Sequence, residues 1–180
     1  MRKAIILIGP RASGKTTIGK MLAADLALTF VDTDEALQQR TGKTIAQIVD
    51  EEGWPAFRKI ESQILKDFTS PEHVVATGGG MVLSEENRNH MKNNGMVFYL
   101  SASIQALVER LSANPAISQR PSLTGLDIID ELSSVLKERE KLYRSATHFV
   151  IDADRNKALV MQDIFNLYLS NIAHQPAPLS

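Results

Sequence analysis

The sequence predicts a three-layer α/β fold, in which a parallel β-sheet is covered by helices on both faces. Short apolar runs alternate with amphipathic helical segments along the chain, which is typical of parallel βαβ units. The first run, Ala4–Ile8, is apolar at every position and leads through a glycine-containing loop into residues with helical spacing. Ligands of such sheets bind beyond the carboxyl ends of the strands, where this loop is expected.

The elements follow one another in regular alternation. The expected strands are Ala4–Ile8, Thr29–Val31, Val74–Ala76, Met96–Leu100 and His148–Ile151. The expected helices are Lys15–Ala27, Asp34–Arg40, Ile45–Glu52, Pro55–Phe68, Glu85–Asn94, Ile104–Leu111, Ile128–Tyr143 and Lys157–Ile172.

Several helix boundaries have a chemical reason. Thr44 and Gln47 have the spacing of a capping box, and Gly53 can close that helix with a left-handed backbone. Pro55 suits the first turn of the next helix. Ser84 can cap a helix whose first turn carries two glutamates, where the helix dipole favours acids.

The composition is that of an ordinary soluble globular protein. Of the 180 residues 43% are apolar and 23% charged, and the formal net charge is −1. This length predicts a single domain, which we place over residues 1–173, with a disordered tail at 174–180 that contains two prolines.

Several classes of function and location are disfavoured. The sequence has no basic tail or stripe of the kind that binds nucleic acid, and it has no apolar run as long as a membrane span. The chain has no cysteine, which excludes disulfides and thiolate chemistry, and its four histidines lack ligand spacing. The first strand begins within a few residues of the start, leaving no room for a signal peptide. We therefore expect a cytoplasmic monomer.

The most informative motif is Gly9–Thr16, which reads G-x-x-x-x-G-K-[ST] between the first strand and the first helix. This is the pattern of a phosphate-binding loop, whose backbone N–H groups and helix N-terminus point at one phosphate cluster. Lys15 supplies a charge for the β- and γ-phosphates, and the Thr16 hydroxyl can ligate Mg²⁺. The sequence therefore predicts a site for a nucleoside triphosphate.

Two acids follow the second strand, at the same expected edge of the sheet. Asp32 or Asp34 can place a carboxylate near Thr16, and Mg²⁺ prefers oxygen ligands. The alternative is structural: Asp32 as a turn residue and Asp34 as the N-cap of the next helix. Their position one βα unit after the loop favours the functional interpretation.

Three glycines, Gly78–Gly80, follow the third strand, where many phosphate-loop ATPases carry a metal-binding aspartate. A flexible turn is the simpler interpretation, but a turn does not need three glycines. We expect the glycines to bring backbone N–H close to a small polar substrate.

Two arginines are placed on apolar helix faces. Arg58 lies at the edge of such a face and Glu61 within it, one turn apart, so the two can form a structural ion pair. Arg139 lies on the apolar stripe of its helix without a partner at helical spacing. Because a guanidinium matches a carboxylate bidentately, an anionic ligand is the favoured interpretation for Arg139.

Residues 114–125 carry proline, serine, glutamine and glycine without apolar periodicity, and we expect them to form a flap. Arg110 precedes the flap and Arg120 lies in it. Either can be a plain surface charge. A flap arginine that closes over the triphosphate would stabilise the transferring group, and closure would exclude water.

The order of these motifs closely resembles the shikimate kinase family. The features that carry the resemblance are the phosphate loop, Asp32-Thr33-Asp34, Arg58 before Gly78-Gly79-Gly80, Arg120-Pro121 and the late Arg139. The resemblance extends from Lys3 to about Leu169, and Ile8–Arg11 with Glu52–Trp54 is most similar to the type II enzymes of enteric-type bacteria.

The resemblance implies a fold like that of nucleoside monophosphate kinases, with a five-stranded parallel sheet, a substrate-binding region at about 33–61 and a mobile lid at about 112–126. It also implies transfer of the γ-phosphate of ATP to the 3-hydroxyl of shikimate, a step toward chorismate and the aromatic amino acids.

Residue roles are implied by the same resemblance. Asp32 would serve Mg²⁺ together with Thr16, and Arg110 would pack on adenine while the lid residue Arg120 approaches the phosphates. The loop around Asp152–Asn156 departs from the family pattern, so no residue is assigned there. Nucleotide phosphates would be contacted by Ala12, Ser13, Gly14, Lys15, Thr16 and Thr17. Shikimate would be held by Asp34, Arg58, Gly79 and Arg139, with Asp34 as the candidate base.

Two other functions share part of this pattern. Another small-metabolite kinase, for gluconate or a nucleoside monophosphate, shares the expected fold, but the two arginines and Gly79 favour a polyhydroxy carboxylic acid. A GTPase-like switch is disfavoured because Asn156–Leu159 lacks the final acid of the guanine-reading Asn-Lys-x-Asp.

Overall fold

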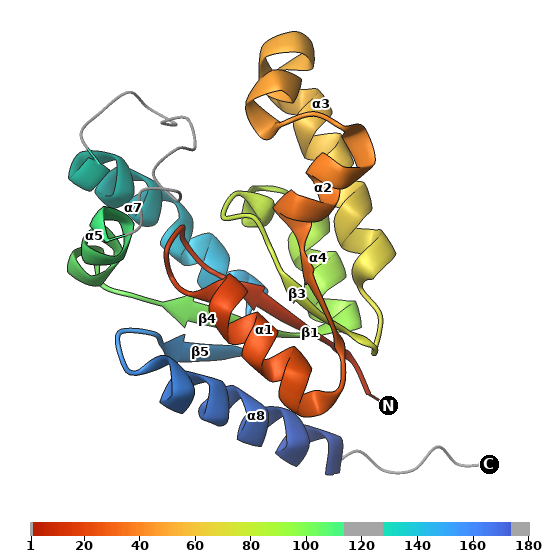
Figure 1. The fold of residues 1–180 in the computed structure, drawn as a ribbon, viewed down its shortest axis with the longest axis vertical. Coiled ribbons are helices and arrows are strands. Elements are labelled where there is room, and N and C mark those ends of the chain that lie inside the picture. The colour runs from red at the N-terminus through yellow and green to blue at the C-terminus, as the bar shows by residue number, and fades with distance from the viewer. Residues whose placement is uncertain (1, 114–127, 174–180) are drawn as a thin grey trace.

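The computed structural model describes residues 2–113 and 128–173, and in them five parallel strands form one sheet (Figure 1). The strand order is β2-β3-β1-β4-β5, so the first strand of the chain is the central one. This confirms the predicted α/β fold with a five-stranded parallel sheet. The strands are β1 (Ala4–Ile8), β2 (Thr29–Asp32), β3 (His73–Ala76), β4 (Gly95–Ser101) and β5 (Phe149–Asp152).

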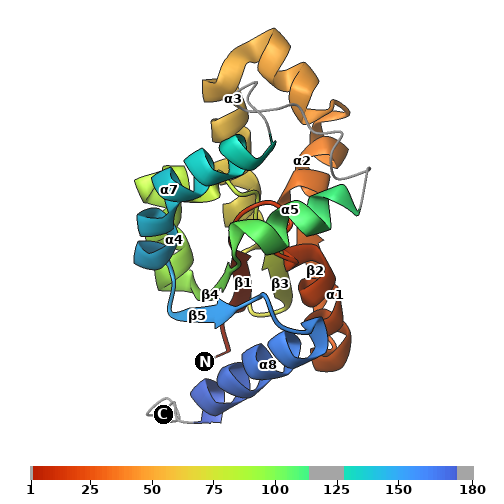
Figure 2. The same cartoon turned by 90° about the vertical axis from the view of Figure 1, so that its left-hand side faces the viewer.

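Helices cover both faces of the sheet, as Figures 1 and 2 show. On one face α1 and α8 lie side by side, and on the other α4 packs against α7. The helices are α1 (Lys15–Leu26), α2 (Thr33–Thr41), α3 (Ile45–Phe68), α4 (Glu85–Asn94), α5 (Ile104–Ser112), α7 (Ile128–Ala146) and α8 (Lys157–Ala173), with a short 3₁₀ helix η1 (Met81–Leu83).

The core divides according to the alternation of side chains along the strands. Ile5 and Leu7 of β1 belong to the cluster beneath α1 and α8, whereas Ile6 and Ile8 belong to the cluster beneath α4, η1 and α7. All of these side chains are buried, which explains why β1 is apolar at every position.

Helices α2 and α3 form a third cluster beside the sheet, and the first half of α3 projects beyond it (Figure 1). The predicted capping box of Thr44 and Gln47 is present at the start of α3. Gly53 interrupts α3 with φ 81° and ψ 168°. The positive φ was expected, but ψ is extended rather than left-handed helical, so the chain changes direction and a second helical segment begins near Pro55.

The structure corrects the expected boundary after β2. Asp32 caps α2, and its side chain accepts hydrogen bonds from the backbone N–H groups of Asp34 and Glu35. The alternative in which Asp34 is the N-cap is therefore wrong, because the helix begins at Thr33. The helix η1 was not expected, since three residues are too short for a periodic pattern.

Several expectations lie outside the described residues. These are the lid residues 114–126 with Arg120, and the tail 174–180. Within residues 2–113 and 128–173, no helix is long and apolar enough to cross a membrane. The same residues contain no group of three or more histidine, aspartate or glutamate side chains able to hold a metal ion.

Candidate active site

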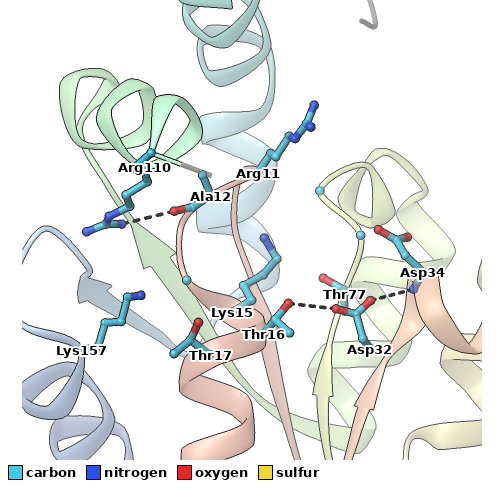
Figure 3. Close-up of a pocket in the computed structure, with 14 residues that line it drawn as sticks. Arg11, Ala12, Lys15, Thr16, Thr17, Asp32, Asp34, Thr77, Arg110 and Lys157 are labelled. Carbon is cyan, nitrogen blue, oxygen red and sulfur yellow. Dashed lines mark hydrogen bonds between the residues drawn. The ribbon is translucent and has the colours of Figure 1, made fainter. Parts of the chain in front are cut away.

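A cavity of about 470 Å³ opens at the carboxyl edge of the sheet. Elements that follow all five strands contribute to it: the loop after β1, the start of α2 after β2, the glycines after β3, the end of α5 after β4, and the start of α8 after β5. This is the edge at which ligands of parallel sheets bind. The residues that line it are Arg11, Ala12, Gly14, Lys15, Thr16, Thr17, Asp32, Asp34, Thr77, Gly78, Gly79, Arg110, Ala113 and Lys157, and Figure 3 shows this group.

The loop Gly9–Thr16 has an unusual backbone. Gly9, Ala12 and Gly14 have φ values of 146°, 64° and 100°. A Cβ on Gly9 would lie 2.7 Å from the carbonyl oxygen of Leu100, so only glycine lets the loop pass this close to β4. The loop thus wraps tightly into the first turn of α1, and the N-terminus of that helix faces the cavity.

The Lys15 side chain turns back into this loop (Figure 3). Its ammonium donates to the carbonyl oxygens of Gly9 at 2.8 Å and Pro10 at 2.7 Å. These acceptors fix the positive charge at the wall of the cavity, where phosphate oxygens can compete for it.

Thr16 and Asp32 meet across the floor of the cavity. The Thr16 hydroxyl donates to one carboxylate oxygen of Asp32 at 2.9 Å, and the other oxygen accepts from the backbone of α2. A hydroxyl and a carboxylate oriented in this way are hard oxygen donors of the kind that Mg²⁺ prefers. The donor set therefore fits a magnesium ion that takes its remaining ligands from water and phosphate.

Arg110 connects two loops at the far side of the cavity. Its guanidinium donates to the carbonyl oxygen of Ala153 at 2.5 Å and to that of Ala12 at 3.4 Å. Lys157, from the first turn of α8, points into the same region (Figure 3). These cations lie on the side of the phosphate loop away from Asp34.

A second cavity of about 150 Å³ adjoins the first. Arg11, Asp34, Gly78 and Gly79 line both cavities, so the two meet at these residues. The walls of the smaller cavity come from the phosphate loop, α2, α3, the glycines and α7. Its lining residues are Pro10, Arg11, Asp34, Ile45, Trp54, Phe57, Arg58, Glu61, Gly78, Gly79, Gly80, Glu131, Leu132, Val135, Arg139 and Tyr143.

Arg58 and Glu61 form the ion pair that their spacing predicted, with 2.6 Å between Nη1 and a carboxylate oxygen. The Glu61 side chain is 2% exposed, and burial raises its pKa to about 7 despite the nearby Arg58. The Arg58 guanidinium also lies over the rings of Trp54 and Phe57, at 5.4 and 5.0 Å from their centroids.

The glycines after β3 leave room for these charged side chains. A Cβ on Gly80 would lie 2.4 Å from an Arg58 nitrogen, and one on Gly78 would lie 2.8 Å from an Asp34 oxygen. Close approach of side chains from α2 and α3 thus explains two of the glycines. The backbone N–H of Gly78 donates to the Thr33 hydroxyl at 2.9 Å.

Arg139 is 8% exposed and lies at the wall of the smaller cavity. Its Nη1 donates to the carbonyl oxygen of Gly79 at 3.2 Å, whereas its Nε has no hydrogen-bond partner among the described residues. A buried guanidinium with an unused donor is suited to an anionic ligand.

Comparison with known proteins agrees with this arrangement. A family model described as shikimate kinase matches residues 11–169. The chain belongs to the shikimate kinase family. Among its relatives, shikimate kinase 2 of Enterobacter sp. (strain 638) is 50% identical over 164 residues, covering 91% of this chain and 94% of the relative. Shikimate kinase 2 of Syntrophotalea carbinolica is 55% identical over 153 residues, covering 85% and 89%.

Solved structures of shikimate kinases have the same fold. The Acinetobacter baumannii enzyme, solved in complex with shikimate, has a TM-score of 0.85 at 34% identity and covers 94% of both chains. The Aquifex aeolicus enzyme has a TM-score of 0.77 at 31% identity, covering 96% of this chain and 99% of that one. A gluconokinase from Sinorhizobium meliloti has a TM-score of 0.59 at 16% identity, which shows a shared fold alone.

The structure brings most of the predicted shikimate kinase site residues to the two cavities. Of the nucleotide-site residues that the structure describes, all except Ser13 line the larger cavity, and Asp34, Arg58, Gly79 and Arg139 line the smaller one. Ser13 is buried within the loop, and Arg120 lies outside the described residues. The sequence reasoning did not assign Arg11, Thr77 or Lys157 to the larger cavity, nor Trp54, Glu61 or Tyr143 to the smaller one.

The sequence does contain a feature that points to two of these residues, Lys157 and Arg11. Lys157 follows the end of β5, so the rule that ligands bind beyond strand ends points to it. Arg11 is a cation inside the phosphate loop. Tyr143 lies at helical spacing from other apolar residues of its helix, and the sequence holds no sign of a partner for its hydroxyl.

Proposed function

We propose that this protein transfers the γ-phosphate of ATP to the 3-hydroxyl of shikimate, giving shikimate 3-phosphate and ADP. In this role it would serve chorismate and aromatic amino acid biosynthesis. The observation that carries the proposal is the junction of two cavities at Asp34 and Gly79, one built around a phosphate loop and the other around buried arginines. Membership of the shikimate kinase family supports the same reaction.

In the proposed complex the larger cavity holds the nucleotide. Backbone N–H groups from Ala12 to Thr17 and the N-terminus of α1 bind the phosphates. Lys15 leaves the carbonyls of Gly9 and Pro10 to bind the β- and γ-phosphates, because a phosphate is a stronger acceptor for an ammonium than a neutral carbonyl. Arg110 packs on the adenine.

Thr16 and Asp32 would hold Mg²⁺, which would supply positive charge to offset that of the phosphates during transfer. Their hydrogen bond of 2.9 Å keeps both oxygens at one point of the floor. The capping bonds of Asp32 to the start of α2 prevent its carboxylate from turning away.

The smaller cavity holds shikimate. Arg58 and Arg139 bind the ring carboxylate, and the buried Asp34 accepts hydrogen bonds from ring hydroxyls at the junction of the two cavities. Gly79 forms the wall between Arg139 and the phosphate loop. In this pose the 3-hydroxyl faces the γ-phosphate.

The transfer then needs little beyond positioning. The oxygen of the 3-hydroxyl attacks the γ-phosphorus, the bond from that phosphorus to the β–γ bridging oxygen breaks, and ADP leaves. The hydroxyl proton passes to Asp34. Because phosphoryl transfer has a loose transition state, orientation of the hydroxyl contributes more than its full deprotonation. Closure of the lid would bring Arg120 to the transferring group.

The proposed function also indicates where the protein works and with which partners. We propose that the protein works in the cytoplasm as a monomer, with small-molecule substrates and neither nucleic acid nor membrane as a partner. The near-neutral net charge of −1 favours none of the partners that a strongly basic chain would attract.

A coupled assay of ADP release tests the function with ATP and shikimate, gluconate or nucleoside monophosphates. We expect turnover to depend on shikimate alone. ADP release that does not respond to shikimate contradicts the proposal. Lys15→Ala should abolish turnover, because the phosphates lose their point charge. Lys20→Ala, at an exposed lysine of the same helix, is the matched control and should keep its activity.

A further inference from the structure

The floor of the smaller cavity includes a tyrosine for which the proposed reaction has no role. Tyr143 is 1% exposed, and its hydroxyl donates to the carbonyl oxygen of Gly79 at 2.7 Å. The same carbonyl accepts the bond of 3.2 Å from Arg139. Arg139 and Tyr143 are one turn apart on α7, so both side chains reach the glycine turn from one face of the helix.

The tyrosine ring is fixed on its other side by the core. It stacks on Tyr99 of β4, with ring centroids 4.9 Å apart and an interplanar angle of 16°. Both rings belong to the cluster that includes Met81 and Val82 of η1, the helix that directly follows the glycines. Tyr143 therefore connects the sheet and α7 to the Gly79 carbonyl, which also accepts from Arg139.

Tyr143 and Arg139 donate to the same acceptor, the Gly79 carbonyl oxygen, and this limits how Arg139 uses its N–H groups. A carbonyl oxygen has two lone pairs, and Tyr143 occupies one with the shorter of the two bonds. Arg139 donates one N–H, that of Nη1, to the other lone pair, and its Nε has no partner among the residues that the structure describes. The guanidinium is thus held through Nη1, while its Nε is left for a ligand.

We propose that Tyr143 is a positioning residue for the acceptor carboxylate, which anchors the Gly79 carbonyl and thereby holds Arg139 toward the smaller cavity. The inference rests on the proposed function, since it assigns the carboxylate of shikimate to Arg139. Without the hydroxyl, Gly79 is less firmly held, and among the described residues Arg139 is left as the side-chain donor to its carbonyl. The guanidinium is then drawn toward the wall and away from the ligand.

The phenol is suited to this role because it stays a donor over the working pH range. Burial raises the pKa of Tyr143 to about 12, so the hydroxyl keeps its proton. A phenylalanine would keep the ring stack and the volume and would remove only the hydrogen bond to Gly79.

The test is Tyr143→Phe, with binding of shikimate followed by the fluorescence of Trp54, the single tryptophan of the chain, which lines the smaller cavity. We expect the Kd and KM for shikimate to rise about fivefold, which is the effect of one hydrogen bond. The KM for ATP should change less than about twofold, because neither Tyr143 nor Arg139 lines the larger cavity.

Tyr99→Phe is the matched control. It removes the hydroxyl of the other ring in the stack, which is also buried and donates to Glu140 of α7 at 2.5 Å. We expect the affinity for shikimate to stay within about twofold of the wild type. An equal loss in both variants would mean that Tyr143 acts only through general packing, and would overturn the proposal.

A double-mutant cycle with Arg139→Ala separates positioning from packing. If Tyr143 acts through Arg139, adding Tyr143→Phe to Arg139→Ala should not weaken shikimate binding further. Additive losses, or an unchanged affinity of Tyr143→Phe alone, would refute the role. Melting temperatures of all variants identify any that do not fold, and binding is compared at a temperature below every transition. A wild type without shikimate-dependent turnover refutes the proposed function instead.

Discussion

Arg139 shows how a single buried charge indicates a ligand. It lies on the apolar stripe of α7 and is 8% exposed; its Nη1 donates to Gly79, and its Nε has no hydrogen-bond partner among the described residues. Keeping a guanidinium in such a place costs several kcal/mol unless other groups pair with it. A substrate carboxylate would supply the missing partner.

Arg139→Ala should strongly weaken the binding of shikimate while ATP binding changes little, because Arg139 lines only the smaller cavity. We expect a loss of at least about a hundredfold in affinity for shikimate, the size typical of breaking a charge-assisted pair. Separate titrations of the two ligands measure it. Arg144→Ala, at a half-exposed arginine of the same helix, is the control. Equal losses for both ligands would place Arg139 elsewhere in the mechanism.

Glu61 gives the site a pH-dependent stability. Burial raises its pKa from 4.5 to about 7 in the folded protein. The folded state therefore binds the proton more tightly than the unfolded state, and stability must fall as the pH rises between these two values. Below pH 4.5 both states are protonated, so the contribution is fully present there.

From pH 4.5 to 8 the free energy of unfolding of the wild type, relative to Glu61→Gln, should fall by about 3 kcal/mol. Urea denaturation at several pH values measures this difference. Glu52→Gln, at an exposed glutamate of the same helix, controls for the change in net charge. A difference between wild type and Glu61→Gln that does not vary with pH would contradict the raised pKa.

The site residues differ in how far the sequence could predict them. Arg139 and Glu61 were predicted to lie on buried faces because helical spacing alone places them among apolar neighbours. The bond from Tyr143 to Gly79 joins positions 64 apart, and helical spacing relates only neighbours within one or two turns. The predicted roles of all the site residues, Asp34, Gly79 and Arg120 among them, stay predictions, since each role needs a bound ligand.

Helix α3 depends on the residue at which it breaks. Gly53 combines φ 81° with ψ 168°, a region that only glycine occupies readily. The break separates Ile48, in the first half, from Phe57 and Ile64 in the second, and all three pack with Leu37 of α2 in one cluster. The backbone of one glycine thus lets two helical segments form one wall of the smaller cavity.

Gly53→Ala should lower the free energy of unfolding by about 2 kcal/mol through backbone strain. A steric clash is not the cause, because the nearest atom to a new Cβ would be the Cδ of Pro55, 3.5 Å away. Gly42→Ala is the comparison: its φ of 67° and ψ of 8° are left-handed helical, and nothing lies within 4 Å. There we expect a loss of about 1 kcal/mol. Equal losses in urea denaturation would refute the ranking.

Helices and strands were predicted correctly where neighbouring residues in the sequence determine them. The strand β1 follows from an unbroken apolar run, and the break in α3 follows from Gly53 and Pro55. The boundary at Asp32 was misread because aspartate is equally suited to a turn and an N-cap, and only the register of α2 decides. The helix η1 depends on tertiary packing against α7, which a three-residue segment cannot encode.

At the scale of the whole molecule, the two cavities at one sheet edge predict separable ligand effects. A ligand at a hundred times its Kd adds about 2.7 kcal/mol of stability, which for a chain of this length raises Tm by about 5 to 10 °C. We expect ATP with Mg²⁺, or shikimate, to give such a shift in a thermal denaturation assay.

A variant in each cavity should lose the increase in Tm that the ligand of that cavity gives. Lys15→Ala should reduce the shift given by the nucleotide and keep that of shikimate, and Arg139→Ala should do the reverse. If either variant lost both shifts, the two cavities would behave as one site and the assignment of separate halves would fail.

The order of the strands also has a consequence for synthesis on the ribosome. The strand β1 is made first, yet its neighbours β3 and β4 begin only at His73 and Gly95. At roughly 5–20 residues per second this apolar strand waits on the order of several seconds for a partner. The hydroxyl of Tyr168, near the end of α8, finally donates to the carbonyl of Lys3. The nascent chain therefore leaves this fully apolar strand unpaired for longest, and the contact between its start and α8 forms only after most of the protein has emerged.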